Sequence, residues 1–216
     1  MQRDYTRPEE IESRSFEIIQ SELTVSLDPA FAPVILRVIH TTADFEYVET
    51  LAFSEGVIER AVTALQQGVP IVSDTYMVKA GVDKTRLNAF GSDIYCFMHD
   101  VDVAEASQQN DVTRARAAID KAAAMRRPLI FAIGNAPTAL LRICELKKAG
   151  LLLPELVIGV PVGFVNVVES KETLMRSGIP YITARGRKGG SNVAAAICNA
   201  LFRIAQPKGD ISYVLQ

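Results

Sequence analysis

The sequence has few of the residues on which redox and metal sites are built. Its 216 residues include three cysteines and two histidines. Cys96, Cys144 and Cys198 are scattered and form no C-x-x-C pair, so we expect reduced core thiols in a cytoplasmic protein. No H-x-x-x-H spacing occurs, and Asp100 and Asp102 alone are too few for a dedicated cation site. We therefore expect no metal centre.

Excess charge and uninterrupted apolar runs are also scarce. The chain carries 23 lysines and arginines against 25 acidic residues, a net charge of −2, so no global field attracts nucleic acid or an acidic membrane. The segment Met1–Glu12 is polar and charged, unlike a secretory signal. The apolar run Leu151–Val168 contains Glu155 and Asn166 and is broken by prolines and glycines. It predicts a buried strand and a turn rather than a membrane span.

Motifs of several common enzyme classes are missing. The sequence contains neither a G-x-S-x-G nucleophile elbow nor a G-x-G-x-x-G dinucleotide fingerprint. Its glycine-rich segment around Gly186 is not a Walker A loop, because the lysine precedes the last glycines instead of following them. Carboxylates or isolated phosphates fit that segment better than a dinucleotide. His99 has no recognisable partner, and we interpret it as a loop histidine.

What the sequence does contain is an alternation of short apolar strands and helical stretches. This alternation predicts an α/β fold with a parallel sheet covered on both faces. In such sheets the ligand binds beyond the carboxyl ends of the strands, where the strand order reverses. We expect a single domain over residues 1–205 and a C-terminal tail over 206–216. The expected strands are 48–53, 70–73, 94–98, 129–133, 156–160 and 181–183, and the expected helices are 8–23, 54–67, 113–125, 136–149, 170–177 and 191–205.

His40 is the candidate acid or base. If the preceding run is helical, Arg37, His40 and Thr41 share one face, since residues three and four apart are neighbours. The apolar residues of the same run then lie on the other face and pack inward: Phe31, Ile35, Val38 and Ile39. A cation, an imidazole and a hydroxyl on one face suit an anionic substrate that must be protonated. The alternative is a helix-end histidine with no role.

Ser15 is a second candidate, because it interrupts an apolar stripe. The first helix should turn Ile11, Phe16, Ile19 and Leu23 inward, with the Ser15 hydroxyl among them. The hydroxyl either bonds back to the carbonyl four residues earlier or serves a ligand at the edge of a site. The pattern alone slightly favours the first reading.

Two loops after strands are candidates for ligand contacts. In the loop 133–140, Asn135 is suited to cap the next helix, whose exposed amides are then positioned to hold a carboxylate. In the segment 159–171, Gly163 lets the backbone approach a flat ligand while the Phe164 ring packs against it, and Ser170 lies in the polar start of the next helix. Ordinary helix capping explains most of the first loop, and a strand exit followed by a capped helix explains the second equally well.

A third loop, 184–192, concentrates positive charge. It holds Arg185, Arg187 and Lys188 together with three glycines between a strand and a helix, a combination typical of an anion nest. Arg114 and Arg116 start another helix. One of the two is expected to belong to a solvated face and the other to add charge to the site.

Taken in order, these segments resemble one family, the precorrin-8X methylmutases of cobalamin biosynthesis. The resemblance covers about residues 8–205. It is carried by Arg37–Asp44, Ile133–Leu140, Gly159–Val165 with Glu169–Lys171, and Gly186–Ser191, and it is helped by Ser15–Phe16 and Thr113–Arg116. Each motif is modest alone, but their joint order is specific.

The resemblance implies a flavodoxin-like three-layer α/β/α sandwich with a mainly parallel sheet of five to six strands, working as a homodimer. It implies an isomerase that moves a methyl group from C-11 to C-12 of precorrin-8X, or of its cobalt form, without an organic cofactor or catalytic metal. The family's catalytic histidine falls on His40, and its substrate-contacting arginine and serine fall on Arg37 and Ser15.

Further substrate contacts are expected on chemical grounds. Carboxylates on the macrocycle require donors, and its flat ring requires apolar walls. The candidates are Thr41, Met77, Arg114, Asn135, Phe164, Ser170, Arg185 and Arg187. Two other functions are kept as alternatives. One is a non-catalytic tetrapyrrole carrier of the same fold, and the other is an unrelated α/β enzyme that binds phosphate at the Gly186 loop.

Overall fold

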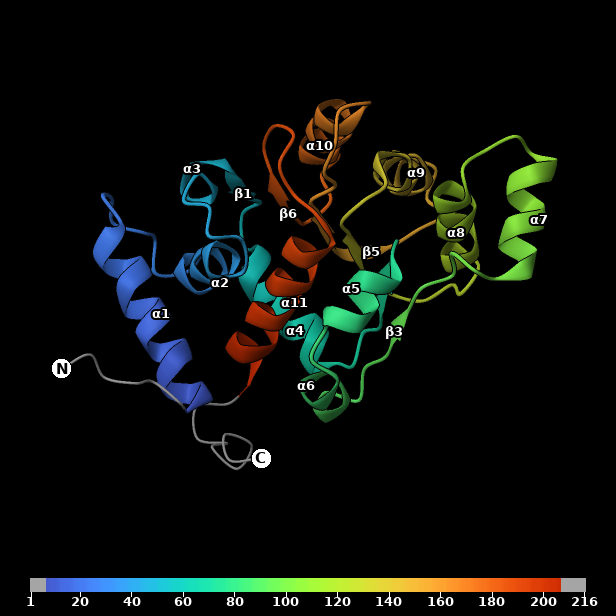
Figure 1. The fold of residues 1–216 in the computed structure, drawn as a ribbon. Helices are drawn as coiled ribbons and strands as arrows, with labels where there is room; N and C mark the ends of the chain where they lie inside the picture. The colour runs from blue at the N-terminus through green and yellow to red at the C-terminus, as the bar shows by residue number, and fades with distance from the viewer. Residues whose placement is uncertain (1–6, 207–216) are drawn as a thin grey trace.

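A six-stranded sheet forms the centre of the protein (Figure 1). The computed structural model describes residues 7–206, and the expected tail lies outside them from residue 207 on. Within the described residues the strand order is β1-β6-β5-β4-β2-β3. All neighbouring pairs are parallel except β1 with β6. The strands are β1 (Leu51–Phe53), β2 (Ile71–Ser73), β3 (Ile94–Tyr95), β4 (Leu129–Ile133), β5 (Pro154–Gly159) and β6 (Tyr181–Ala184).

Helices cover both faces of this sheet, as expected for strands that are apolar on both sides. In β4, Ile130 and Ala132 face one apolar cluster, and Leu129, Phe131 and Ile133 face the other. This alternation, with period two, gives the expected three-layer α/β/α arrangement. The helices are α1 (Pro8–Glu22), α2 (Ala32–Thr42), α3 (Tyr47–Thr50), α4 (Val57–Gln66), α5 (Tyr76–Gly81), α6 (Lys84–Ala89), α7 (Val101–Gln109), α8 (Arg114–Ala123), α9 (Pro137–Lys148), α10 (Val167–Arg176) and α11 (Ser191–Ala205).

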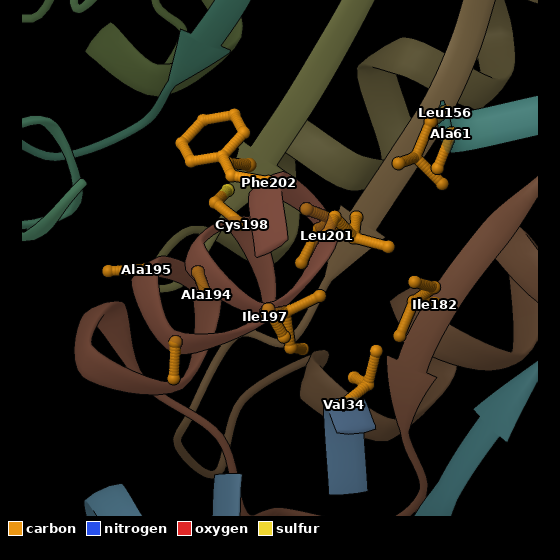
Figure 2. Close-up of a cluster of buried hydrophobic side chains, with 14 of the residues drawn as sticks. Val34, Ala61, Leu156, Ile182, Ala194, Ala195, Ile197, Cys198, Leu201 and Phe202 are labelled. Atoms are coloured by element: carbon orange, nitrogen blue, oxygen red, sulfur yellow. The ribbon is translucent and has the colours of Figure 1, made fainter. Parts of the chain in front are cut away.

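Helix α11 lies at the centre of the larger apolar cluster. It packs against α2, α4 and α5 and against the strands β4 and β5. Its side chains Ile197, Leu201 and Phe202 point into a cluster that also contains Val34 of α2 and Ile182 of β6 (Figure 2). Helix α2 packs against α11, and α1 packs against α2, so these contacts hold the two N-terminal helices against the core.

The structure departs from the expected elements in a few places. Residues 48–50, expected at the start of a strand, belong to the short helix α3 instead, and β3 ends at Tyr95 rather than at 98. Helices α5, α6 and α7 were not expected. Local caps explain two of them, since the side chains of Thr75 and Asp83 accept hydrogen bonds from the backbone amides of Val78 and Arg86.

The strand order reverses between β2 and β4. From β2 the chain runs to β3 on one side and then returns to place β4 on the other, so the carboxyl ends of β2 and β4 mark the crevice where open sheets bind ligands. Ser73 and Ile133 end these two strands. Among residues 7–206, no helix combines the length and the apolar character needed to cross a membrane.

Candidate functional site

His40 lies in the last turn of α2, on the side turned away from the core. Val34, Ile35, Val38 and Ile39 are buried, whereas the His40 side chain is exposed. The expected division of this helix into two faces is therefore confirmed for Ile35, Val38 and Ile39, while Phe31 is half-buried at the N-cap.

One aromatic ring on α1 supports both His40 and Arg37. The centroids of the Phe16 and His40 rings are 5.1 Å apart, with an angle of 23° between the planes. The guanidinium carbon of Arg37 lies 4.8 Å from the centroid of the same Phe16 ring. Stacking and cation–π contacts of this kind favour defined orientations. The imidazole and the guanidinium thus both contact one aromatic ring of α1.

The Ser15 hydroxyl donates a hydrogen bond to the carbonyl oxygen of Ile11 at 2.8 Å. This is the back-bond that the helix pattern favoured, and it leaves the hydroxyl oxygen able to accept a further bond. Ser15 immediately precedes Phe16 and is half-buried. The expectation that Ile11 faces inward is wrong, because its side chain is 48% exposed.

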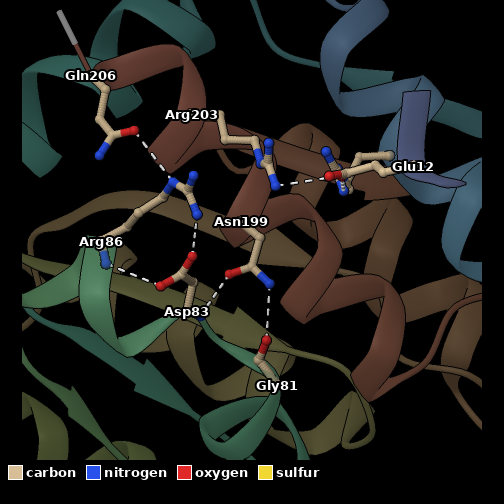
Figure 3. A network of polar contacts seen from close by, with 8 residues as sticks. Glu12, Gly81, Asp83, Arg86, Asn199, Arg203 and Gln206 are labelled. Carbon is tan, nitrogen blue, oxygen red and sulfur yellow. Dashed lines mark hydrogen bonds and ion pairs between the residues drawn. The ribbon is translucent and has the colours of Figure 1, made fainter. Parts of the chain in front are cut away.

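Glu12 on α1 joins Arg37 to Arg203 of α11, and Figure 3 shows its contact with Arg203. Its Oε1 accepts a hydrogen bond from Nη1 of Arg37 and lies 3.4 Å from Nη2 of Arg203. Burial raises the pKa of Glu12, but the bond from Arg37 and the charges of Arg37, Arg203 and His40 outweigh it, so the pKa lies below its ordinary value. The sequence pattern missed both Glu12 and Arg203.

A cleft of about 310 Å³ opens beside this cluster. It lies between α2, the turn from α5 to α6, and α11, and it is lined by Arg37, Thr41, Asn192, Asn199 and Arg203 among others. The predicted residues Arg37 and Thr41 thus line one cavity. His40 follows Arg37 by three positions on the same helix and directly precedes Thr41.

The amides at the start of α9 are already occupied. The Asp74 carboxylate accepts hydrogen bonds from the backbone amides of Gly134, Asn135 and Ala136 at 2.9, 2.8 and 2.6 Å. The expectation that these amides are open to a ligand carboxylate is therefore wrong. Asn135 is not the N-cap either, since that position belongs to Ala136, and its side chain is exposed.

Asp74 was not recognised from the sequence, although it directly follows β2 at the point where the strand order reverses. It is 3% exposed. Burial raises the pKa of Asp74 above its ordinary value, and the three amide bonds oppose this rise without cancelling it. A buried carboxylate therefore ties the end of β2 to the end of β4.

The segment after β5 presents an aromatic ring to solvent. Phe164 is 82% exposed, and the guanidinium carbon of Arg187 lies 5.4 Å from its ring centroid. Gly163, at φ 141°, donates its backbone amide to the carbonyl oxygen of Arg187 at 3.2 Å. The loops after β5 and β6 are thus neighbours.

The Ser170 side chain, expected to contact the substrate, is fully buried. Its hydroxyl donates a hydrogen bond to the carbonyl oxygen of Val167, so it is not available to a ligand, contrary to expectation.

A buried lysine fixes the glycine-rich loop after β6. Lys171 is 1% exposed, and its Nζ donates to the carbonyl oxygens of Gly186 and Lys188 at 3.0 and 2.7 Å. Burial lowers the pKa of Lys171 to about 8. Gly189 is required here, because a Cβ at this position would lie 2.2 Å from the carbonyl oxygen of Val160.

Of the three cations in the loop after β6, one is paired and two are exposed. Lys188 binds Asp44 at 2.6 Å and Glu46 at 2.8 Å, and these bonds raise its pKa to about 12. Asp44 therefore faces Lys188. Arg185 and Arg187 have exposed side chains, which leaves them as the loop's candidates for an anion.

Arg114 lies apart from the cleft at Arg37. Together with His99 it lines a groove of about 600 Å³ between α7 and the start of α8. His99 lies in a turn, and its ring stacks on Tyr76 with centroids 4.6 Å apart. Met77, the neighbour of Tyr76 on α5, is 66% exposed.

Arg116 is paired with Glu145 through two bonds of 3.0 and 2.8 Å. Of Arg114 and Arg116, it is therefore Arg116 that belongs to a solvated face.

The three cysteines are free and buried, as expected of core thiols. Burial raises the pKa of Cys144 to about 11 and that of Cys198 to about 12. Within residues 7–206, no three histidine, cysteine or acidic side chains come together as a metal site.

Comparison with known proteins agrees with this architecture. The family model for precorrin-8X methylmutase matches residues 10–204. The cobalt-precorrin-8 methylmutase of Salmonella typhimurium is 43% identical, with 91% of this chain and 95% of the relative covered. That of Priestia megaterium is 42% identical, with 92% and 89% covered. A solved precorrin-8X methylmutase of Thermus thermophilus superposes with a TM-score of 0.83 at 39% identity, covering 90% of this chain and 96% of that one. The chain belongs to the precorrin-8X methylmutase family, a family of isomerases.

Proposed function

We propose that this protein moves a methyl group from C-11 to C-12 of precorrin-8X, or of cobalt-precorrin-8, in cobalamin biosynthesis, giving hydrogenobyrinate or cobyrinate. One observation carries the proposal. The exposed His40 ring and the Arg37 guanidinium contact the same Phe16 ring, which presents a proton carrier beside a carboxylate-binding group. The relatives named methylmutases, at about 40% identity, support the same reaction.

The chemistry needs no external nucleophile. The bond from the methyl carbon to C-11 breaks and a bond to C-12 forms within one molecule, while the electrons redistribute over the conjugated ring. Protonation of a ring nitrogen next to the migration terminus withdraws electron density and lowers the barrier. His40 gives this proton and takes it back from the product, so the balance closes. A general acid or base of this kind contributes about 10²–10⁴-fold to the rate.

The substrate contacts follow from the chemistry of a flat polycarboxylate. Arg37 binds one carboxylate, with the Ser15 and Thr41 hydroxyls as further partners. The exposed Phe164 and Met77 side chains supply apolar surface. Arg185 and Arg187 are available for other carboxylates of the same molecule, as are Arg114 and the Asn135 side chain where the macrocycle reaches them.

We further infer a homodimer, in keeping with the family resemblance. Ile11 and Ile18, both on α1, are 48% and 42% exposed, and they are separated by two helical turns on the same side of the helix. Two exposed isoleucines on one side of a helix are suited to contact with a second copy of the chain. Sedimentation equilibrium of the full chain tests this, and a monomer at all concentrations would contradict it.

Turnover decides between the mutase and the carrier. Purified protein is mixed with precorrin-8X or with cobalt-precorrin-8, and the visible spectrum is followed under multiple-turnover conditions. We expect conversion of at least one of the two to the product spectrum. Stoichiometric binding without conversion of either would contradict the mutase and support the carrier. Binding of sugar phosphates or nucleotides without corrinoid binding would contradict both.

A further inference from the structure

We propose that the cleft between α2, the α5–α6 turn and α11 is a subsite for one acid side chain of the macrocycle, with Arg203 as its second cation. The inference rests on the proposed function, because the ligand is a carboxylate of that same substrate. It assigns a role to Arg203, which lines the cleft together with Arg37.

The ion pairs beside the cleft join three arginines to only two carboxylates, so this cluster has a net charge of +1. Arg37 and Arg203 converge on a single carboxylate, that of Glu12. Asp83, an acidic residue that also lines the cleft, is paired with the neighbouring Arg86. Burial and then the charge of Arg37 lower the pKa of Arg203, as expected of two guanidinium groups that repel each other. A further carboxylate in the cleft supplies the missing charge and bonds to N–H groups that Glu12 does not use.

Glu12 contacts the two arginines from the α1 side and is not among the residues that line the cleft. The Arg37 side chain is 16% exposed and the Arg203 side chain 44% exposed. Glu12 therefore restrains both guanidinium groups without filling the space in front of them. This arrangement makes Glu12 a positioning residue for the subsite.

The far wall of the cleft is held in place before any ligand arrives. The Asn199 side chain accepts from the backbone amide of Asp83 at 2.8 Å and donates to the carbonyl oxygen of Gly81 at 2.9 Å (Figure 3). Gly81 allows a close approach, because a Cβ at this position would lie 2.9 Å from Cβ of Ala195 on α11. A preformed wall lowers the ordering cost of binding.

The size and place of the cleft fit a side chain of the substrate rather than its ring. A volume of about 310 Å³ is at the lower end of the range for drug-sized ligands, and a corrinoid macrocycle is larger than these. Arg37 and Thr41, which line the cleft, flank His40 on α2. An acid side chain held in the cleft therefore anchors the macrocycle with one edge near His40.

Affinity for the product tests this subsite without relying on turnover. Cobyrinate and its fully methyl-esterified form are titrated into the wild-type protein, Arg203→Gln, Arg203→Lys and the control Arg60→Gln. Arg60 lies on α4, pairs with Glu155, and is 54% exposed. We expect Arg203→Gln to weaken the binding of the acid about 10–100-fold, as for the loss of a bond between charged groups. The ester should bind more weakly than the acid but equally to the wild type and to Arg203→Gln. For the acid, Arg203→Lys should be intermediate and Arg60→Gln should resemble the wild type.

Arg203→Gln that binds the acid as tightly as the wild type would overturn the subsite, as would an equal loss for acid and ester. If instead the proposed function is wrong, the wild-type protein itself neither binds nor converts a corrinoid. Wild-type turnover together with an unaltered Arg203→Gln would leave the mutase standing and remove the subsite alone.

Discussion

The His40 ring stacks on the Phe16 ring, with centroids 5.1 Å apart and an interplanar angle of 23°. Phe16 belongs to α1 and His40 to α2, so the contact fixes the imidazole relative to a second helix. Arg37 uses the same ring from 4.8 Å. The orientation of two proposed site residues thus depends on one aromatic side chain that has no chemistry of its own.

Replacement of Phe16 should therefore impair the reaction more than the fold. Phe16→Leu keeps apolar bulk but removes the ring, so we expect kcat/KM to fall about 10-fold, as for the loss of one or two aromatic contacts of about 1 kcal/mol. The control is Phe31→Leu, which removes the stack of Phe31 on Phe53 and should leave kcat/KM near the wild-type value. Equal kinetics for the two variants would show that the Phe16 ring does not orient the site.

Asp74→Asn should strongly destabilise the protein. Both carboxylate oxygens of Asp74 accept hydrogen bonds from backbone N–H groups. An asparagine side chain would place its own NH2 group against one of these donors. We expect the free energy of unfolding to fall by about 2–4 kcal/mol, since bonds to charged groups contribute about 1.5–3 kcal/mol each. Urea denaturation measures this, with the exposed Asp93→Asn as the control. A loss below about 0.5 kcal/mol would contradict the role of Asp74 as the tie between β2 and β4.

Lys171 should make stability depend on pH above 8. Burial lowers its pKa from 10.5 to about 8, so above that pH the folded protein has lost a proton that the unfolded chain retains. Stability therefore rises with pH between about 8 and 10.5, by at most about 1.4 kcal/mol per pH unit. Urea denaturation at several pH values should show this rise in the wild type relative to Lys171→Met. The exposed Lys148→Met should follow the wild type, and parallel curves for wild type and Lys171→Met would rule out the shift.

The sequence was sufficient where the periodicity of a single element decides the outcome. The faces of α2 follow from the spacing of Ile35, Val38 and Ile39, and the buried strand β4 is expected at residues 129–133 and found at Leu129–Ile133. The order of the motifs along the chain also indicates the family. The faces of a helix depend on neighbours three and four positions away, and those of a strand on neighbours two positions away.

The contacts that the sequence did not reveal join distant segments. The amides at the start of α9 looked open to a ligand, but Asp74, about 60 positions earlier, fills them once β2 and β4 are adjacent. Asp44 lies four residues after His40, yet its carboxylate binds Lys188 from the loop after β6. Strand order and helix packing decide these pairings, and no local pattern encodes them.

The single-turnover rate of His40→Ala with saturating precorrin-8 substrate tests the proposed chemistry most directly. We expect this variant to bind the substrate but to convert it about 10²–10⁴-fold more slowly than the wild type. His99→Ala removes the other histidine, which lies in a turn against Tyr76, and should convert the substrate at the wild-type rate. Conversion by His40→Ala at the wild-type rate would contradict a proton transfer by His40.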